Sequence, residues 1–145
     1  MLALLALVSA ALFTGAALYV SFAEHPARMA LDDRAALAQW KPAYTRGAIM
    51  QAGLALIGGL AGVAVWYKWQ SVWPWLVGGI LMLANIAWTF AVIWRTNNRL
   101  KATPLDQAGP ETRALLVKWG RLHLGRSALG LLATGFFVWG NWPTG

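Results

Sequence analysis

The chain carries only two histidines, His25 and His123, and each lies in a charged segment next to an apolar stretch. Imidazole is the side chain best suited to proton transfer near neutral pH, so both are candidate catalytic residues. Arg126 follows His123 by three residues, which on a helix places the two on one face. A guanidinium there, together with the carboxamide of Asn97, can stabilise a developing oxyanion.

Four further residues are candidates for binding a substrate. Trp119 and Tyr44 offer ring faces on which a flat aromatic ligand can stack. Gln51 lies inside an apolar stretch, where an amide needs either a ligand or an interhelical hydrogen bond. Asn98, beside Asn97, completes this predicted set.

A metal or haem site is an alternative use of the same residues. His25, His123 and Glu24 resemble a set of two histidines and one carboxylate, and two histidines can also ligate a haem axially. However, the spacing matches no HxxxH or HExxH motif. A purely structural reading also stays open: Arg126 and Arg46 can reach the headgroups, and Glu24 can pair with either of these two arginines.

The elements that must position these residues are apolar. Four stretches contain no charged residue, and they cover residues 1–23, 47–67, 69–94 and 127–145. About 20 apolar residues cross a bilayer core of roughly 30 Å as a helix. The pattern therefore predicts a single all-α domain over 1–145, an antiparallel four-helix bundle in a membrane, with spans at about 2–24, 43–67, 73–96 and 118–140.

Composition excludes several classes. The chain is 59% hydrophobic and 12% charged, and a soluble bundle would need polar outer faces that these stretches lack. With no cysteine there are no disulfides, thiolate metal sites or cysteine nucleophiles. The first stretch has no basic n-region and is long for a signal peptide, so we expect it to remain as a helix.

The basic residues indicate the orientation. Eleven of the 12 Lys and Arg lie in 24–46 and 95–126, which places these segments in the cytoplasm and both termini on the non-cytoplasmic side. The net charge of +7 then reflects topology and attraction to anionic lipid, and we expect no nucleic-acid partner. We expect a multi-pass protein of the cell membrane, specifically a bacterial inner membrane.

Proline and glycine predict where helices end and touch. Pro26 is expected to end or bend the first helix near His25, and Pro42 suits the first turn of the second, after a short amphipathic helix over 32–40. Gly58 and Gly62 form a GxxxG pair, which favours packing within the bundle and leaves a homo-oligomer contact as the alternative.

Three motifs resemble those of the anthrone oxygenase-like family of small four-span membrane proteins. They are Glu24-His25-Pro26-Ala27, Thr96-Asn97-Asn98-Arg99-Leu100, and Trp119-x-x-x-His123-x-x-Arg126, and their order and spacing match over nearly the whole chain. The resemblance implies oxidation of an anthrone to an anthraquinone with molecular oxygen. It also implies that the shared positions are His25, Asn97, Trp119, His123 and Arg126.

The predicted function is thus a membrane-embedded oxygenase or oxidoreductase acting on a flat, apolar, phenolic or quinone-type molecule. His123 or His25 would remove a proton, Arg126 and Asn97 would stabilise the anion, and oxygen would react with it, with or without a metal. The alternatives are a non-catalytic bundle that binds haem, a metal or a quinone, an accessory subunit of a larger complex, and, least favoured by the few polar residues of the outer half, a small transporter.

Overall fold

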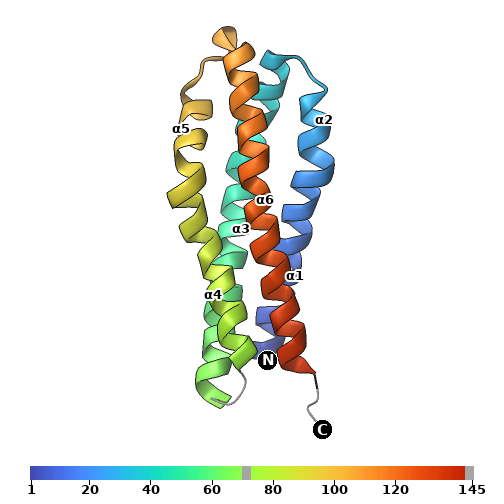
Figure 1. Cartoon of the computed structure of the whole chain (residues 1–145), viewed down its shortest axis with the longest axis vertical. Helices are drawn as coiled ribbons and strands as arrows, with labels where there is room; N and C mark the ends of the chain where they lie inside the picture. The colour runs from blue at the N-terminus through green and yellow to red at the C-terminus, as the bar shows by residue number, and fades with distance from the viewer. Residues whose placement is uncertain (70–72, 143–145) are drawn as a thin grey trace.

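A computed structural model describes residues 1–69 and 73–142, and these fold into four long helical rods (Figure 1). The first rod comprises α1 (Leu2–Tyr19), the π-helix η1 (Val20–Glu24) and α2 (His25–Met29). The second is α3 (Asp33–Trp69). The third comprises α4 (Trp73–Trp88), the π-helix η2 (Thr89–Ile93) and α5 (Trp94–Ala102). The 3₁₀-helix η3 (Leu105–Gln107) then leads to the fourth rod, α6 (Pro110–Asn141).

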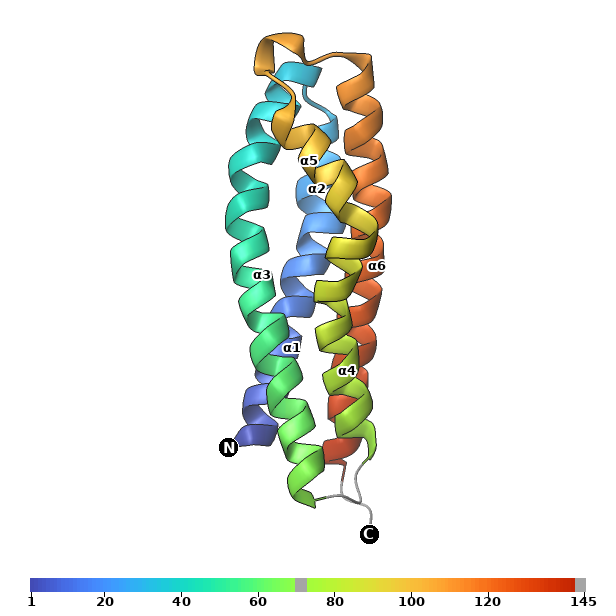
Figure 2. The same ribbon diagram turned by 90° about the vertical axis from the view of Figure 1, so that its left-hand side faces the viewer.

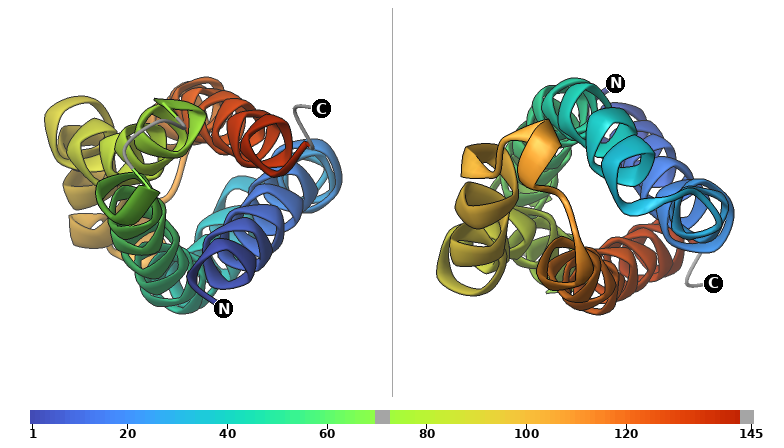
Figure 3. Two further views of the ribbon diagram at one scale, coloured as in Figure 1. Left: turned by 90° about the horizontal axis from the view of Figure 1, so that it is seen from below. Right: turned by 90° about the horizontal axis from the view of Figure 1, so that it is seen from above.

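The rods form a bundle in which each contacts two neighbours. α1 packs against α3 and α6, and α4 packs against the same two helices from the other side. Figure 2 shows the rods running side by side along the long axis, and the end views of Figure 3 show them arranged around a common centre. The N-terminus and the end of α6 lie at the lower end, while the α2–α3 and α5–α6 connections lie at the upper end.

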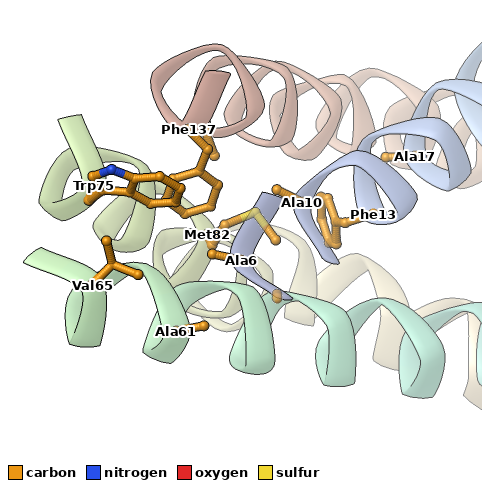
Figure 4. Close-up of a cluster of buried hydrophobic side chains, with 11 residues drawn as sticks. Ala6, Ala10, Phe13, Ala17, Ala61, Val65, Trp75, Met82 and Phe137 are labelled. Atoms are coloured by element: carbon orange, nitrogen blue, oxygen red, sulfur yellow. The ribbon is translucent and has the colours of Figure 1, made fainter. Parts of the chain in front are cut away.

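The lower half of the bundle is held mainly by apolar side chains, with a hydrogen bond from the Trp75 indole to the carbonyl oxygen of Gly140. Small residues of α1 and α3 leave room for large ones of α4 and α6, and Figure 4 shows Trp75, Met82 and Phe137 converging on Ala6 and Ala10. The rings of Trp75 and Phe137 stack with centroids 5.1 Å apart. In a bilayer such contacts stabilise through close packing, because lipid is as apolar as the core.

Close approach in this half depends on glycine. A Cβ at Gly58 would meet Ser9 and Met82 at 3.2 Å, and one at Gly62 would meet the ring of Phe137 at 2.6 Å. Both glycines therefore face the interior of the bundle, as the favoured prediction of packing within the bundle requires. The alternative, a homo-oligomer contact through Gly58 and Gly62, gains no support from this placement.

Neither Pro26 nor Pro42 lies at the end of a rod as expected, although the first rod departs from regular α-helical geometry in η1, just before Pro26. The first rod continues through Pro26 to Met29, because the wide π-helical turn of η1 directly precedes the proline and relieves the clash of its ring with a preceding carbonyl. The second helix starts at Asp33, so the expected short helix over 32–40 is its first part and Pro42 lies inside it. Pro42 is on the exposed side, where solvent or headgroups can satisfy the freed carbonyl.

Three of the rods are long and apolar enough to cross a membrane, namely Leu2–Met29, Asp33–Trp69 and Trp73–Ala102. They indicate a membrane protein. The fourth rod, α6, has sufficient length but is not among these candidates within the described residues. The reason is its content: the buried face of α6 includes His123, Arg126 and Ser127, which lower its hydropathy. A fourth crossing stays a prediction.

Candidate functional site

A cavity of about 310 Å³ lies in the upper half of the bundle, between the first rod, α3 and α6. Six of the predicted site residues line it: Glu24, Tyr44, Gln51, Trp119, His123 and Arg126. The rest of the wall consists of small, apolar and basic residues of the first rod and α3: Ala16, Tyr19, Val20, Arg28, Ala43, Arg46, Gly47, Ala48 and Met50. The cavity thus collects side chains that are as much as 110 positions apart in the sequence, from Ala16 to Arg126.

Arg126 is a buried cation that no described residue neutralises. Its exposed fraction is 7%, its Nε atom has no hydrogen-bond partner, and it belongs to none of the ion pairs found across residues 1–69 and 73–142. Its observed neighbour is the ring of Phe13, whose centroid lies 5.5 Å from Cζ. Burying an unpaired guanidinium is costly, so the arrangement favours an anionic or acceptor group in the cavity.

Gln51 also has an unpaired buried atom, but here the atom is a hydrogen-bond acceptor. This residue of α3 is 2% exposed, lines the cavity, and has no partner for its Oε1 atom among the described residues. An unpaired buried acceptor needs a donor. The cavity therefore combines a free donor on Arg126 with a free acceptor on Gln51, as a ligand carrying both a hydroxyl and an anionic oxygen requires.

His123 reaches the cavity from α6. Its Nδ1 atom lies 3.0 Å from the hydroxyl oxygen of Ser21, and its ring stacks on Trp119 with centroids 4.9 Å apart. No partner of Nε2 occurs in the part of the chain that the structure describes. One imidazole nitrogen is thus anchored and the other is available for proton transfer.

Asn97 lies behind the cavity wall. It is fully buried; its Oδ1 accepts a hydrogen bond from the Trp119 indole at 2.9 Å, and its Nδ2 donates to the Tyr44 hydroxyl at 3.0 Å. Both polar atoms of the amide are engaged and it does not line the cavity, so the expected role as oxyanion donor does not fit this placement. Asn97 instead positions the two aromatic residues, and Trp40 supports Tyr44 by stacking on it with centroids 4.7 Å apart.

His25 is likewise engaged elsewhere. Arg28 donates through Nη1 to His25 Nδ1 at 3.2 Å, through Nη2 to Glu24, and through Nε to Gln39. Arg28 is 3% exposed, so this is a closed, buried network in which the guanidinium is satisfied. Because arginine can only donate, Nδ1 of His25 must accept, and that nitrogen has no free lone pair for a substrate proton.

The same contacts decide against the predicted metal ligands. No group of three or more His, Cys, Asp and Glu that could hold a metal ion occurs among the described residues. Nδ1 of His25 accepts from Arg28, and its other nitrogen packs against Gly120. Glu24 is paired with the same guanidinium. The set of His25, His123 and Glu24 therefore does not fit a metal, and axial ligation of haem by both histidines would require His25 to leave its place.

The remaining prediction, Asn98, is exposed and does not line the cavity. Two residues that the sequence reading missed are Arg28 and Ser21. Arg28 could have been found from its spacing, because Glu24 precedes it by four residues and such pairs meet on a helix. Nothing in the local sequence marks Ser21, since its partners lie more than 100 positions away.

Comparison with known proteins places the chain in a family. No curated protein and no solved structure matches it. The profile of the family described as anthrone oxygenase matches residues 40–136, about two thirds of the chain. The match includes Tyr44, Gln51, Asn97 and the Trp119–Arg126 segment, while the wall contributed by the first rod precedes it. The chain therefore belongs to the anthrone oxygenase family.

Proposed function

We propose that the protein is a membrane-embedded oxygenase that oxidises a flat, apolar, phenolic substrate of the anthrone type within this cavity. The observation that carries the proposal is Arg126, a buried guanidinium that none of the described residues pairs with, next to His123 in the wall of one cavity. Membership of the anthrone oxygenase family supports the same reaction.

His123 acts as the base. Its Nε2 removes a proton from the activated methylene carbon of the substrate, and the resulting enolate oxygen accepts a hydrogen bond from the guanidinium of Arg126. The Tyr44 hydroxyl already accepts from Asn97, so its own proton is free for the same anion. Trp119 and Tyr44 hold the ring, and Gln51 accepts a hydrogen bond from a phenolic hydroxyl.

The overall reaction balances without another reductant. The methylene group loses two hydrogens and gains one oxygen atom, while the second oxygen atom of O₂ leaves as water. The carbon gives up four electrons and O₂ takes up four. Removal of the first proton makes the carbon electron-rich enough to react with O₂, and this step depends on the residues of this chain.

The membrane placement follows from distances along α6. At about 1.5 Å per residue, Trp119 lies about 30 Å from Trp139, which equals the thickness of a bilayer core. Arg126 then lies about 10 Å inside the boundary. We propose that α6 is the fourth crossing of an antiparallel bundle in the cell membrane, with both termini on the non-cytoplasmic side and the cavity near the cytoplasmic boundary.

The test is turnover of anthrone by the purified protein in lipid nanodiscs. We expect O₂ uptake and anthraquinone formation in equal amounts, above the rate in empty nanodiscs. Arg126→Gln lowers kcat/KM by about 100-fold, because a charge that stabilises the anion is lost. Arg121→Gln is the matched control, since Arg121 is an exposed arginine of the same helix.

Three results would count against the proposal. Full turnover by folded Arg126→Gln or His123→Gln protein would show that this cavity is not the active site. Quenching of tryptophan fluorescence by anthrone without any O₂ uptake would favour the alternative of a non-catalytic binding bundle. A Soret band in the purified protein would favour haem binding.

A further inference from the structure

We infer that Ser21 and Ser127 are positioning residues that hold His123 in one tautomer, with the proton on Nδ1 and the lone pair on Nε2. The inference deepens the proposed function, and its kinetic consequence rests on that function. The tautomer itself is a property of the folded chain and can be observed without turnover.

Three hydrogen bonds form a continuous chain from the first rod to α6 and back. Ser127 Oγ lies 3.1 Å from the carbonyl oxygen of Ala17. Ser21 Oγ lies 3.0 Å from Ser127 Oγ. The same Ser21 oxygen lies 3.0 Å from Nδ1 of His123. All three contacts join segments that are more than 100 positions apart, so they depend on the packed bundle.

The direction of this chain follows from counting protons. A carbonyl oxygen has no proton, so Ser127 must donate to Ala17 and its single hydroxyl proton is used there. The bond between the two serines then takes its proton from Ser21. With its own proton used, Ser21 can only accept from His123, and Nδ1 of that imidazole must carry the hydrogen.

If the hydrogen bonds ran in the opposite direction, two oxygen atoms would face each other without a proton between them. If Ser21 donated to His123, Ser127 would have to donate to Ser21. The oxygens of Ser127 and Ala17 would then face each other at 3.1 Å, in a buried position, without a proton between them. Two acceptors that close repel each other and neither is satisfied, so the first direction is favoured.

The consequence is a defined base. Nε2 of His123 keeps its lone pair in a residue that lines the cavity, where the proposed function requires it. His25 has the opposite arrangement, because Nδ1 accepts from Arg28 and a neutral ring must carry its proton on Nε2. The two imidazoles are therefore expected to be different tautomers in one protein.

The π-helix η1 places the Ser21 hydroxyl. Ser21 is the second residue of this segment, where the turn is wider than in an α-helix, and Ala17 precedes it by one turn. π-Helical turns occur frequently at functional sites. The irregular segment thus brings one serine against the base and leaves the carbonyl of Ala17 within reach of the other.

The tautomers can be read by NMR of ¹⁵N-histidine-labelled protein in nanodiscs, at a pH where both imidazoles are neutral. Protonated and bare ring nitrogens have well-separated resonances, and the chain contributes only two histidines. The variant His25→Gln assigns the signals of His123. We expect a proton on Nδ1 of His123 in the wild-type protein, and a proton on Nε2 would overturn the inference without any variant.

Substitutions test the serines. Ser21→Ala removes the acceptor of the Nδ1 proton, so the ¹⁵N signals of His123 move towards a mixture of tautomers, and Ser127→Ala moves them part of the way. Ser9→Ala is the matched control, because Ser9 is another buried serine of the first rod and lies away from His123. Spectra of both site variants that equal the control spectrum would overturn the inference.

The kinetic readout separates this inference from the proposed function. If the inference and the proposed function both hold, Ser21→Ala lowers kcat by about 10-fold or more, because the lone pair of His123 no longer lies on Nε2 in every molecule. KM changes little, because the wall of the cavity is intact. If the wild-type protein shows no turnover but carries the proton on Nδ1 of His123, the proposed function is contradicted and the inference about the serines is not. If turnover is normal but the proton lies on Nε2 of His123, the role of the serines is contradicted and the proposed function is not.

Discussion

The imidazole of His25 occupies the space beside Gly120 that a Cβ atom would fill. Nε2 and Cδ2 of His25 are the two atoms nearest to such a Cβ. His25 belongs to α2 and Gly120 to α6, so the absence of a side chain on one rod lets the other rod place its imidazole between Arg28 and Trp119.

Replacing Gly120 with alanine is therefore expected to displace His25. Overpacking of this kind costs about 1–3 kcal/mol, and the bond from Arg28 to His25 is lost with it. Gly135→Ala on the same helix is the control, since no atom lies within 4 Å of a Cβ there. Thermal unfolding in detergent, followed by circular dichroism, measures both. Equal midpoints for the two variants would show that the contact is unimportant.

Asn97 is expected to matter through the two aromatic residues that it joins. Asn97→Ala leaves the indole N–H of Trp119 buried without an acceptor, which costs about 1–3 kcal/mol, and it releases the Tyr44 ring. We expect affinity for an anthrone-type ligand, measured by quenching of tryptophan fluorescence, to fall about 10-fold. Asn98→Ala, at the exposed neighbouring position, serves as the control and should leave affinity unchanged. A normal affinity in Asn97→Ala would contradict the positioning role.

Arg28 is expected to carry more stability than an exposed arginine in a similar pair. The side chains of Arg28 and Glu24 are 2% and 21% exposed, whereas those of Arg99 and Glu111 are 54% and 81% exposed. Arg28→Met should cost about 3 kcal/mol, because the partly buried carboxylate of Glu24 loses its charged partner. Arg99→Met should cost less than about 1 kcal/mol.

The double variant Glu24→Gln with Arg28→Met checks the cause of this loss. It removes the unpaired charge along with its partner, so it should unfold at a higher denaturant concentration than Arg28→Met alone. If the double variant is as unstable as the single one, the charge pair is not the source of the stability.

The orientation of the bundle can be tested because the chain has no cysteine. Gln107→Cys introduces a thiol into η3 at the upper end, and Trp142→Cys introduces one beyond α6 at the lower end. With a membrane-impermeant maleimide on intact bacterial cells, we expect Trp142→Cys to be labelled and Gln107→Cys to be labelled only after lysis. The reverse pattern would place the cavity on the outer side.

Much of the fold can be read from local sequence, because the free energy of placing a residue in lipid depends on that residue and its neighbours. The charge-free stretches locate the apolar helices, and the three-residue spacing of His123 and Arg126 places them on one face of α6. Helix ends are a different matter. The helices continue through both prolines, each of which lacks an N–H donor. A π-helical turn compensates at Pro26, and an exposed outer face compensates at Pro42.

For the candidate site too, some features follow from local sequence and others only from the packing of the rods. Sequence alone determined that two imidazoles, a guanidinium and several amides occur in the segments at the upper end of the bundle. Only the tertiary structure decided which of them are engaged: Arg28 donates to Glu24 and Gln39, Asn97 is used by Trp119 and Tyr44, and Nε of Arg126 has no hydrogen-bond partner among the described residues. The reason is physical. Periodicity sets the face on which a side chain lies, but its hydrogen-bond partners come from other rods, and the packing of small against large residues determines which of them arrive within reach.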